Sequence, residues 1–133
     1  IGNARFAPDG QTIVYDAAWG GGRGEIYLTR IESPESSPLG VPDAKVQAVS
    51  ATAEVAAILR PRDQGGFVYL GTLARFPLVG GRPREIVDSV YSADWAPDGR
   101  SLAAIRFVGG TCRIEAPIGR VIHTSNAWMS HLR

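Results

Sequence analysis

Residues 94–105 read DWAPDGRSLAAI, and a closely related stretch, RFAPDGQTIVY, occupies residues 5–15. In both stretches an aromatic residue precedes Ala-Pro-Asp-Gly, and an apolar run follows. Proline fixes φ at the first turn position, aspartate bonds back to the following backbone, and glycine accepts the positive φ of a type I turn with a G1 bulge. Two β-hairpin corners are therefore predicted, and their signature residues are Pro8, Asp9, Gly10, Pro97, Asp98 and Gly99.

The spacing of the two corners indicates a repeat. Pro8 and Pro97 lie 89 residues apart, which is two periods of about 44 and falls in the range of a four-stranded propeller blade, roughly 40–50 residues. A middle copy is expected near residues 50–58, SATAEVAAI, where VAAI matches LAAI and TIVY but the Pro-Asp-Gly corner is lost. We expect the turn of this degenerate copy to be the least regular.

Short β-branched or aromatic runs flank each corner, and no segment keeps a helical period of 3.6. Third strands are predicted at residues 24–31, 71–78 and 111–118, and fourth strands at 37–41, 84–90 and 120–125. Turns are predicted between them at ESPESSP (32–38) and VGGRP (79–83). The alternative is a helix over the alanine-rich residues 48–59, but the repeat register favours a strand there.

The predicted fold is all-β: a partial β-propeller of about three blades, each a four-stranded antiparallel sheet. The blades are assigned to residues 1–43, 44–90 (the degenerate copy) and 91–125, with 126–133 as the first strand of a further blade. Propellers typically have four to eight blades. Either the natural chain continues, which the tail cut in mid-repeat favours, or two copies complete a ring of about six blades by self-association.

Composition limits the possible functions. The chain has 133 residues, 44% of them hydrophobic, and a net charge of +1, which suits one globular unit. Its 14 basic residues are scattered, so no nucleic-acid-binding face is expected. No apolar stretch approaches the roughly 18 residues of a membrane helix. A single cysteine, Cys112, excludes an internal disulfide, and cytoplasm and periplasm stay equally open.

No catalytic residue, cofactor or metal is predicted. There is no Gly-x-Ser-x-Gly elbow and no kinase catalytic segment, and Lys45, the only lysine, is interpreted as an exposed strand-edge charge. The loop WGGGRGE (19–25) matches neither phosphate-binding glycine pattern, and residues 94–105 lack the ligands of a calcium loop. His123 and His131 are too few for zinc.

Contact with a partner is expected at a loop face, through Trp19 and Arg23. The aromatic residues before the corners, Phe6, Trp95 and Trp128, are expected to pack between blades. Four acidic residues on or beside strands are expected mainly on salt-bridged solvent faces, with a central channel as the alternative: Asp16, Glu25, Glu32 and Glu115. Their candidate partners are Arg30, Arg75, Arg106 and Arg113.

The repeat F/W-A-P-D-G, together with LARFPLVGGRPREI (73–86), resembles the TolB-like family of WD-like propeller repeats. The longer stretch 71–106 is similar to the propeller that follows the kinase domain in some bacterial serine/threonine protein kinases. This resemblance implies a non-catalytic propeller that binds a protein partner or senses a small ligand within a larger kinase-like protein. The alternatives are the gating propeller of a prolyl-oligopeptidase-like serine peptidase, a TolB-like translocation protein, and a self-assembling propeller fragment.

Overall fold

The computed structural model describes residues 2–18, 23–64 and 68–126. These ranges form strands and turns without a helix, so the helix considered for residues 48–59 is wrong. The strands are β1 (Ala4–Phe6), β2 (Thr12–Ala17), β3 (Glu25–Arg30), β4 (Ser33–Pro42), β5 (Ala44–Val49), β6 (Glu54–Asp63), β7 (Tyr69–Pro77), β8 (Arg84–Trp95), β9 (Leu102–Val108), β10 (Thr111–Glu115) and β11 (Val121–Ser125).

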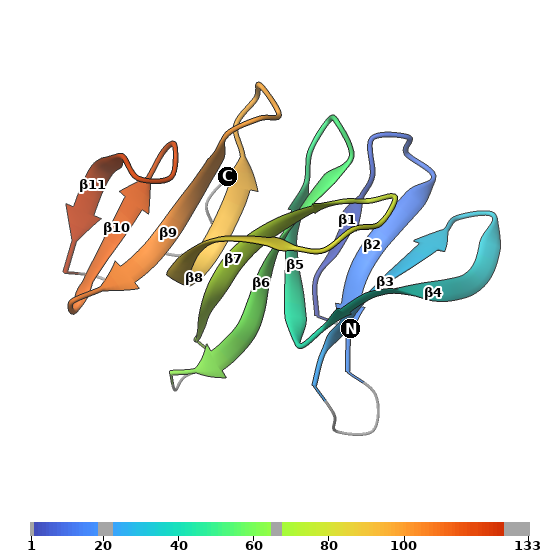
Figure 1. The fold of residues 1–133 in the computed structure, drawn as a ribbon, viewed down its shortest axis with the longest axis horizontal. Coiled ribbons are helices and arrows are strands. Elements are labelled where there is room, and N and C mark those ends of the chain that lie inside the picture. The colour runs from blue at the N-terminus through green and yellow to red at the C-terminus, as the bar shows by residue number, and fades with distance from the viewer. Residues whose placement is uncertain (1, 19–22, 65–67, 127–133) are drawn as a thin grey trace.

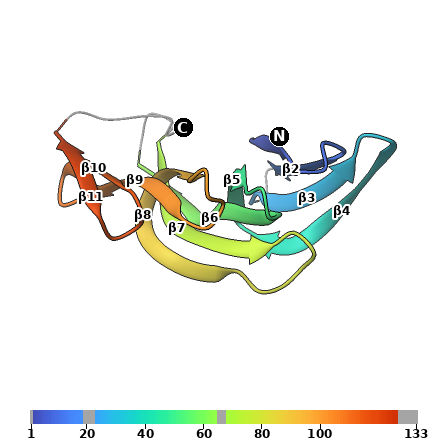
Figure 2. The same ribbon diagram turned by 90° about the horizontal axis from the view of Figure 1, so that it is seen from above.

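The strands form two antiparallel sheets in which each strand pairs with its neighbours in sequence (Figure 1). β1–β4 make a four-stranded sheet, and β5–β11 make a seven-stranded sheet. The sheets stand side by side in an arc, with β1 and β5 on its concave side and β4 and β7 on its convex side (Figure 2). From β1 to β4, and from β5 to β7, the order of strands therefore runs from the inside of the arc to the outside, as expected for blades.

The strand β8 joins the strands β5–β7 to the strands β9–β11. Its first half pairs with β7, for example Arg84 with Arg75, and its second half pairs with β9, for example Trp95 with Leu102. Ser89, between the halves, has a φ of 57° and marks the change of partner. The blade boundary predicted at residues 90 and 91 lies inside this continuous strand.

The two Pro-Asp-Gly corners have the same backbone geometry. Gly10 and Gly99 have φ values of 68° and 70°, which confirms the positive φ predicted for both. In the first corner, the Ala7 amide donates to the carbonyl of Thr12 at 2.8 Å, and the Gly10 amide donates to the carbonyl of Ala7 at 3.0 Å. The third repeat has the equivalent pair of bonds, so both corners are closed by the backbone.

The corner aspartates hold the chain after the turn. One carboxylate oxygen of Asp9 accepts the backbone amides of Gln11 and Thr12 at 2.8 and 2.9 Å. Asp98 accepts the amides two and three residues further on in the same way, at 2.8 and 3.1 Å. These backbone hydrogen bonds lower the pKa of both carboxyl groups. The role of both aspartates is thus explained by the turn itself.

The middle corner is one residue shorter. The Ser50 amide donates to the carbonyl of Glu54 at 2.8 Å, and the Ala53 amide donates to the carbonyl of Ser50 at 3.0 Å. The hydroxyl of Ser50 accepts the amides of Thr52 and Glu54, which replaces the missing aspartate. Ala53 stands where glycine is needed and has a φ of 61°.

We expect Ala53→Gly to stabilise the fold by about 0.5–1 kcal/mol, because an L-residue in the left-handed region is strained and glycine is not. Urea unfolding of the variant measures the change. The matched control is Ala51→Gly in the same turn, where no positive φ occurs. That control should lower the free energy of unfolding, and a decrease for both variants would contradict the prediction.

Two apolar clusters form the core, and each packs several strands together. One cluster joins the first sheet to β5–β7, and its members include Val14, Ile26, Val46, Val55 and Phe76. The other joins β6 and β7 to β8 and β9, and its members include Ala56, Ile58, Leu73, Val90 and Leu102. Trp95 packs against the second cluster, as expected, whereas Phe6 is 60% exposed and that expectation is wrong. Phe6 ends β1, an edge strand of the first sheet.

Asp16 holds the seam between the two sheets. Its carboxylate accepts the backbone amides of Val46 at 2.8 Å and of Asn3 at 3.3 Å, and the Asn3 side-chain amide donates to the carbonyl of Val46 at 3.0 Å. Burial raises the pKa of Asp16, because it disfavours the charged form more than these hydrogen bonds favour it. The expected solvent-facing position of Asp16 is therefore wrong.

The turns outside the corners agree only in part with the sequence. VGGRP lies in the connection between β7 and β8 and includes part of its turn, which confirms the turn predicted there. ESPESSP was expected to be a turn, but all of it except Glu32 belongs to β4. β4 is the edge strand of its sheet, where proline can be accommodated because one side of the strand needs no ladder hydrogen bonds.

Candidate functional site

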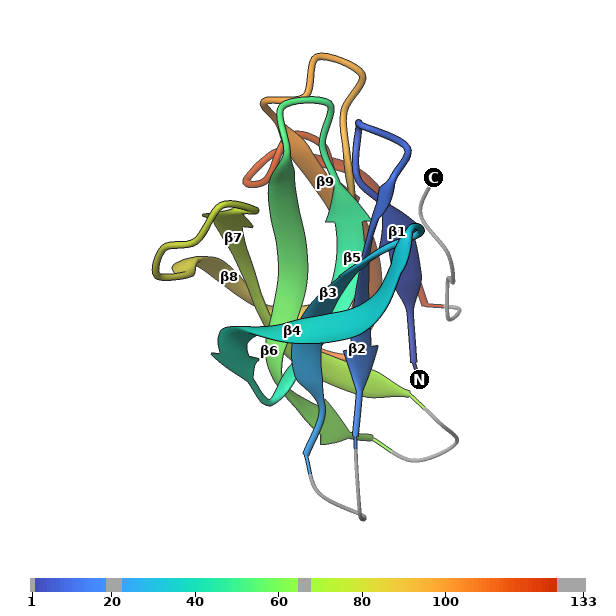
Figure 3. The same cartoon turned by 90° about the vertical axis from the view of Figure 1, so that its right-hand side faces the viewer.

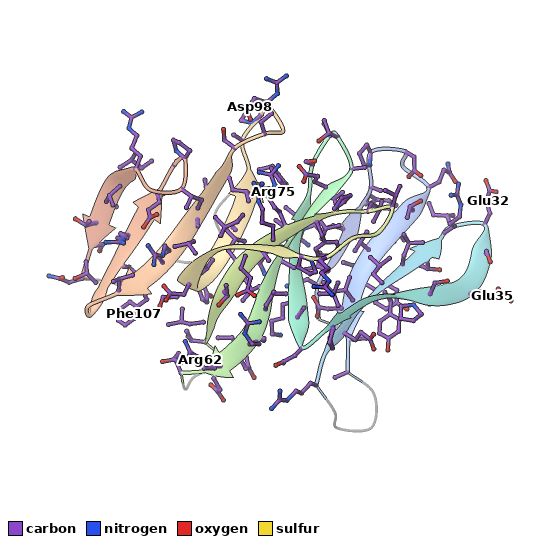
Figure 4. The ribbon with its side chains drawn as sticks, viewed as in Figure 1. Glu32, Glu35, Arg62, Arg75, Asp98 and Phe107 are labelled. Atoms are coloured by element: carbon purple, nitrogen blue, oxygen red, sulfur yellow. The ribbon has the colours of Figure 1, made fainter. Side chains whose placement is uncertain are left out.

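Arg23, one of the two predicted partner residues, lies at one end of the molecule. Figure 3 shows that β2 and β6 finish at this end, while the corners between β1 and β2 and between β5 and β6 lie at the other. Arg23 precedes β3 here; its side chain is 82% exposed and contacts Asp43 at 3.2 Å. Trp19 and Trp128 lie outside the described residues. The six corner residues do not share this end of the molecule with Arg23, and Figure 4 places Asp98 far from Arg62.

A cavity of about 550 Å³ brings Arg23 together with two more arginines from β6, Arg60 and Arg62. We call it the arginine hollow. Asp43, Thr72 and Asp88 also line it. The sequence pointed to Arg23 but not to Arg60 or Arg62, because their convergence depends on an irregularity in the pairing of β6 with β7.

A β-bulge places Arg60 at the hollow. Leu59 pairs with Thr72 and Arg62 pairs with Leu70, so Arg60 and Pro61 together stand opposite a single residue, Gly71. Arg60 has a φ of 50°, and its amide donates to the carbonyl of Asp43 at 2.7 Å. Asp43 has a φ of 51° as well. Bulges and strained non-glycine residues cluster at functional sites, which makes this edge of the sheet the best candidate.

The ion pairs at the hollow are easily exchanged. The Arg23–Asp43 pair is exposed on the arginine side, and in the Arg60–Glu85 pair, at 2.6 Å, both side chains are more than half exposed. Exposed pairs of this kind contribute roughly 0–1 kcal/mol. Arg62 has no ion-pair partner among the described residues. An incoming carboxylate or phosphate can therefore replace the present partners at small cost.

A buried charge network lies behind the hollow. Glu115 accepts Arg106 Nη1 at 2.8 Å, Arg113 Nε at 2.9 Å and the Gly119 amide at 2.9 Å. Arg106 reaches back to Asp88, at 2.9 Å, which lines the hollow. Arg106 and Arg113 are two of the four arginines named as candidate partners of the acidic residues, but Glu115 is buried, so its expected place on a solvent face is wrong.

The ionised form of Glu115 is favoured by its partners. Burial opposes ionisation, but the hydrogen bonds from Arg106 and Gly119 and the charges of Arg106 and Arg113 outweigh it, so the pKa of Glu115 is lowered. All its strong contacts are within the protein. We therefore interpret this network as structural support for Asp88 at the edge of the hollow.

The other candidate chemistries find little support in the described ranges. His123 is exposed on β11, and no three His, Cys, Asp or Glu side chains gather there as metal ligands. Cys112 is buried on β10. Lys45 lies on the edge strand β5, as predicted, but it is half buried with its ammonium 4.8 Å from the Tyr69 ring centroid. In residues 2–18, 23–64 and 68–126, no helix has the length and hydropathy needed to cross a bilayer.

Gly71 keeps the bulge in place, and we expect Gly71→Ala to lower the free energy of unfolding by about 1–3 kcal/mol. A Cβ atom there would lie 2.5 Å from both Ile58 Cγ2 and the carbonyl oxygen of Leu59. Gly24→Ala is the matched control, since its Cβ would meet nothing closer than 3.4 Å. Equal urea midpoints for the two variants would show that the bulge does not depend on Gly71.

No protein-family model matches the chain, and no curated protein matches it in sequence. Two solved structures are similar in fold. TolB from Acinetobacter baumannii is 16% identical with a TM-score of 0.65, and 91% of this chain covers 32% of the TolB chain. The β-propeller domain of the Trilobed protease from Pyrococcus furiosus, described as having an open velcro topology, is 17% identical with a TM-score of 0.59, and 92% of this chain covers 41% of it.

These similarities concern the fold. Both neighbours are propeller proteins, and the described strands are antiparallel and pair in sequence order within each sheet, so the chain is a partial β-propeller as predicted. The chain spans about a third of one neighbour and two fifths of the other. In a protein with a complete ring, further blades would therefore add to the surface around the arginine hollow.

Proposed function

We propose that this propeller segment is a non-catalytic binding module whose arginine hollow receives an acidic group of a protein partner. The observation that carries the proposal is the convergence of Arg23, Arg60 and Arg62 on one cavity beside a strained bulge. Guanidinium groups suit planar carboxylates and phosphates, which they bind through two parallel hydrogen bonds. The hollow lies at the end of the molecule where β2 and β6 finish, opposite the corners (Figure 3). The connections at this end differ from blade to blade, as is usual for binding loops.

The module belongs, in our proposal, to a larger bacterial protein of the serine/threonine kinase-like type. Only the resemblance of residues 71–106 to kinase-associated propellers supports this context. The structural similarity to a protease propeller supports a second candidate, a propeller that gates a peptidase, and the similarity to TolB supports a TolB-like protein. Neighbouring sequence separates them: a kinase domain and membrane helix upstream favour the first, a Gly-x-Ser-x-Gly hydrolase domain downstream the second.

Selection from a random peptide library displayed on phage, with this chain as the immobilised target, tests the binding role. We expect the selected peptides to be rich in Asp and Glu and to lose binding when Arg23→Glu and Arg62→Glu are combined. Arg82→Glu is the control, because Arg82 is exposed in the loop before β8 and does not line the hollow. Binding that survives the double variant, or that Arg82→Glu weakens equally, would disprove a role for the hollow.

A further inference from the structure

A second cavity, of about 240 Å³, lies on the inner strands and is separate from the arginine hollow. We call it the inner pocket. Its polar lining includes Arg5 from β1, Lys45 and Gln47 from β5, and Tyr91 and Ser92 from β8. Figure 2 shows β1 and β5, which contribute Arg5, Lys45 and Gln47 to the pocket, on the concave side of the arc. Residues distant in the sequence therefore meet here through the arrangement of blades.

The lining of the inner pocket includes two cations, Arg5 and Lys45, and no acid among the described residues. The acid associated with Lys45 is Asp16, which lines a neighbouring cavity. Both oxygens of the Asp16 carboxylate already accept backbone amides, those of Val46 and Asn3. A ligand that brings its own negative charge would thus complete the pocket.

The walls of the inner pocket are held in position before any ligand arrives. The ammonium of Lys45 lies over the ring of Tyr69, 4.8 Å from its centroid, in a cation–π contact. Gln47 donates to the carbonyl of Val46 and accepts the amide of Ala93, both at 3.2 Å, which ties β5 to β8. Binding to preorganised side chains loses little conformational entropy.

We propose that the inner pocket binds a small organic anion, with its carboxylate held by Arg5 and Lys45 and its body against Tyr69, Tyr91 and Ile58. The lining is mainly polar apart from two tyrosine rings, and these rings favour an anion with a flat ring over inorganic anions. The volume is below the roughly 300–1,000 Å³ of pockets for drug-sized molecules, which restricts the ligand to a single small ring or short chain. This site uses none of the three hollow arginines and goes beyond the binding role proposed above.

Benzoate is the probe, and benzamide is its neutral isostere. We expect benzoate to bind the whole chain in titrations followed by NMR, with affinity on the order of millimolar for so small a ligand. Benzamide should bind roughly ten-fold more weakly, because a charge-assisted hydrogen bond is lost. Lys45→Met, which keeps the length of the side chain and removes its charge, should weaken benzoate binding by a similar factor.

Arg120→Met is the matched control, since it removes one exposed charge from the loop before β11, outside the pocket. It should change benzoate affinity by less than about two-fold, because distant exposed charges are screened. Arg5→Gln repeats the test if Lys45→Met lowers the far-UV circular dichroism of the fold. The proposal is overturned if benzoate shows no saturable binding, if benzamide binds equally well, or if Lys45→Met binds like the wild type. Arg62→Glu should leave benzoate binding unchanged, which separates this site from the arginine hollow.

Discussion

Glu115→Ala is expected to lower the free energy of unfolding by about 3 kcal/mol. Removing one partner of a buried ion pair typically costs about 3–5 kcal/mol, because the other charge stays buried without compensation. Here Arg106 is left in that position, with a side chain only 10% exposed. The lower end of the range applies because Arg106 keeps its contacts with Asp88, at 2.9 Å to the carboxylate and 2.8 Å to the carbonyl.

Urea unfolding at neutral pH measures this change, and Glu85→Ala is its control. Glu85 also pairs with an arginine, Arg60, at 2.6 Å, but both side chains are more than half exposed. Its removal should therefore cost less than about 1 kcal/mol. If the two variants lost the same stability, the buried network would contribute no more than a surface ion pair.

The contribution of Glu115 should also depend on pH. Its pKa in the folded chain is lowered, so the ionised carboxylate stabilises the fold above the unfolded value of about 4.3. As the pH falls through that value towards the folded pKa, this stabilisation is lost. The difference in unfolding free energy between the wild type and Glu115→Ala should therefore shrink on acidification below about pH 4.5. A difference independent of pH would mean that packing, and not charge, causes the effect.

The fold was largely predictable because its signals are local. Pro-Asp-Gly corners dictate their own geometry through φ and through a side chain that bonds two residues ahead, so Gly10 and Gly99 have the predicted conformation. The middle corner was detectable only from the apolar run after it. In this corner the Ser50 hydroxyl accepts the backbone amides that an aspartate accepts in the other two. The turn is also shorter, so the Pro-Asp-Gly pattern does not describe it.

The errors arise where tertiary contacts decide the outcome. Serine and proline made residues 32–38 look like a turn, yet pairing with β3 on one side only lets them form the edge strand β4. The charge of Glu115 predicted an exposed side chain, but Glu115 is buried and its carboxylate accepts hydrogen bonds from Arg106 and Arg113. A prediction of burial from the type of one residue takes no account of hydrogen-bond partners that lie elsewhere in the chain.

The candidate site was predictable only through Arg23. Arg60 and Arg62 give no signal in the sequence, because a bulge opposite Gly71 sets where they project. The inner pocket has the same origin: Arg5, Lys45 and Tyr91 are far apart in the chain and meet because each blade contributes its inner strand. Both candidate sites therefore depend on contacts between repeats, which the sequence of a single repeat does not contain.

Phe76→Ala is expected to lower the free energy of unfolding by about 3–5 kcal/mol, the usual cost of deleting a buried aromatic ring. Phe76 is 2% exposed and belongs to the cluster that includes Val14 and Ile26 from the first sheet and Val46 from the second. The lost ring would thus leave a cavity at the seam between the sheets. Domains of this size have only about 5–15 kcal/mol of stability, so the variant should be close to unfolding.

Phe6→Ala is the control of the same residue type, and it also tests self-association. Phe6 is 60% exposed on the edge strand β1, so its removal from a monomer should change stability by less than about 0.5 kcal/mol. Light scattering on the wild type and on both variants gives their mass in solution. If two copies closed a ring through this face, Phe6→Ala would dissociate the dimer and cost as much stability as Phe76→Ala. An unchanged mass and a small effect of Phe6→Ala would show that the chain does not close a ring through Phe6. The stability of the fold would then depend on the buried seam at Phe76 and not on self-association.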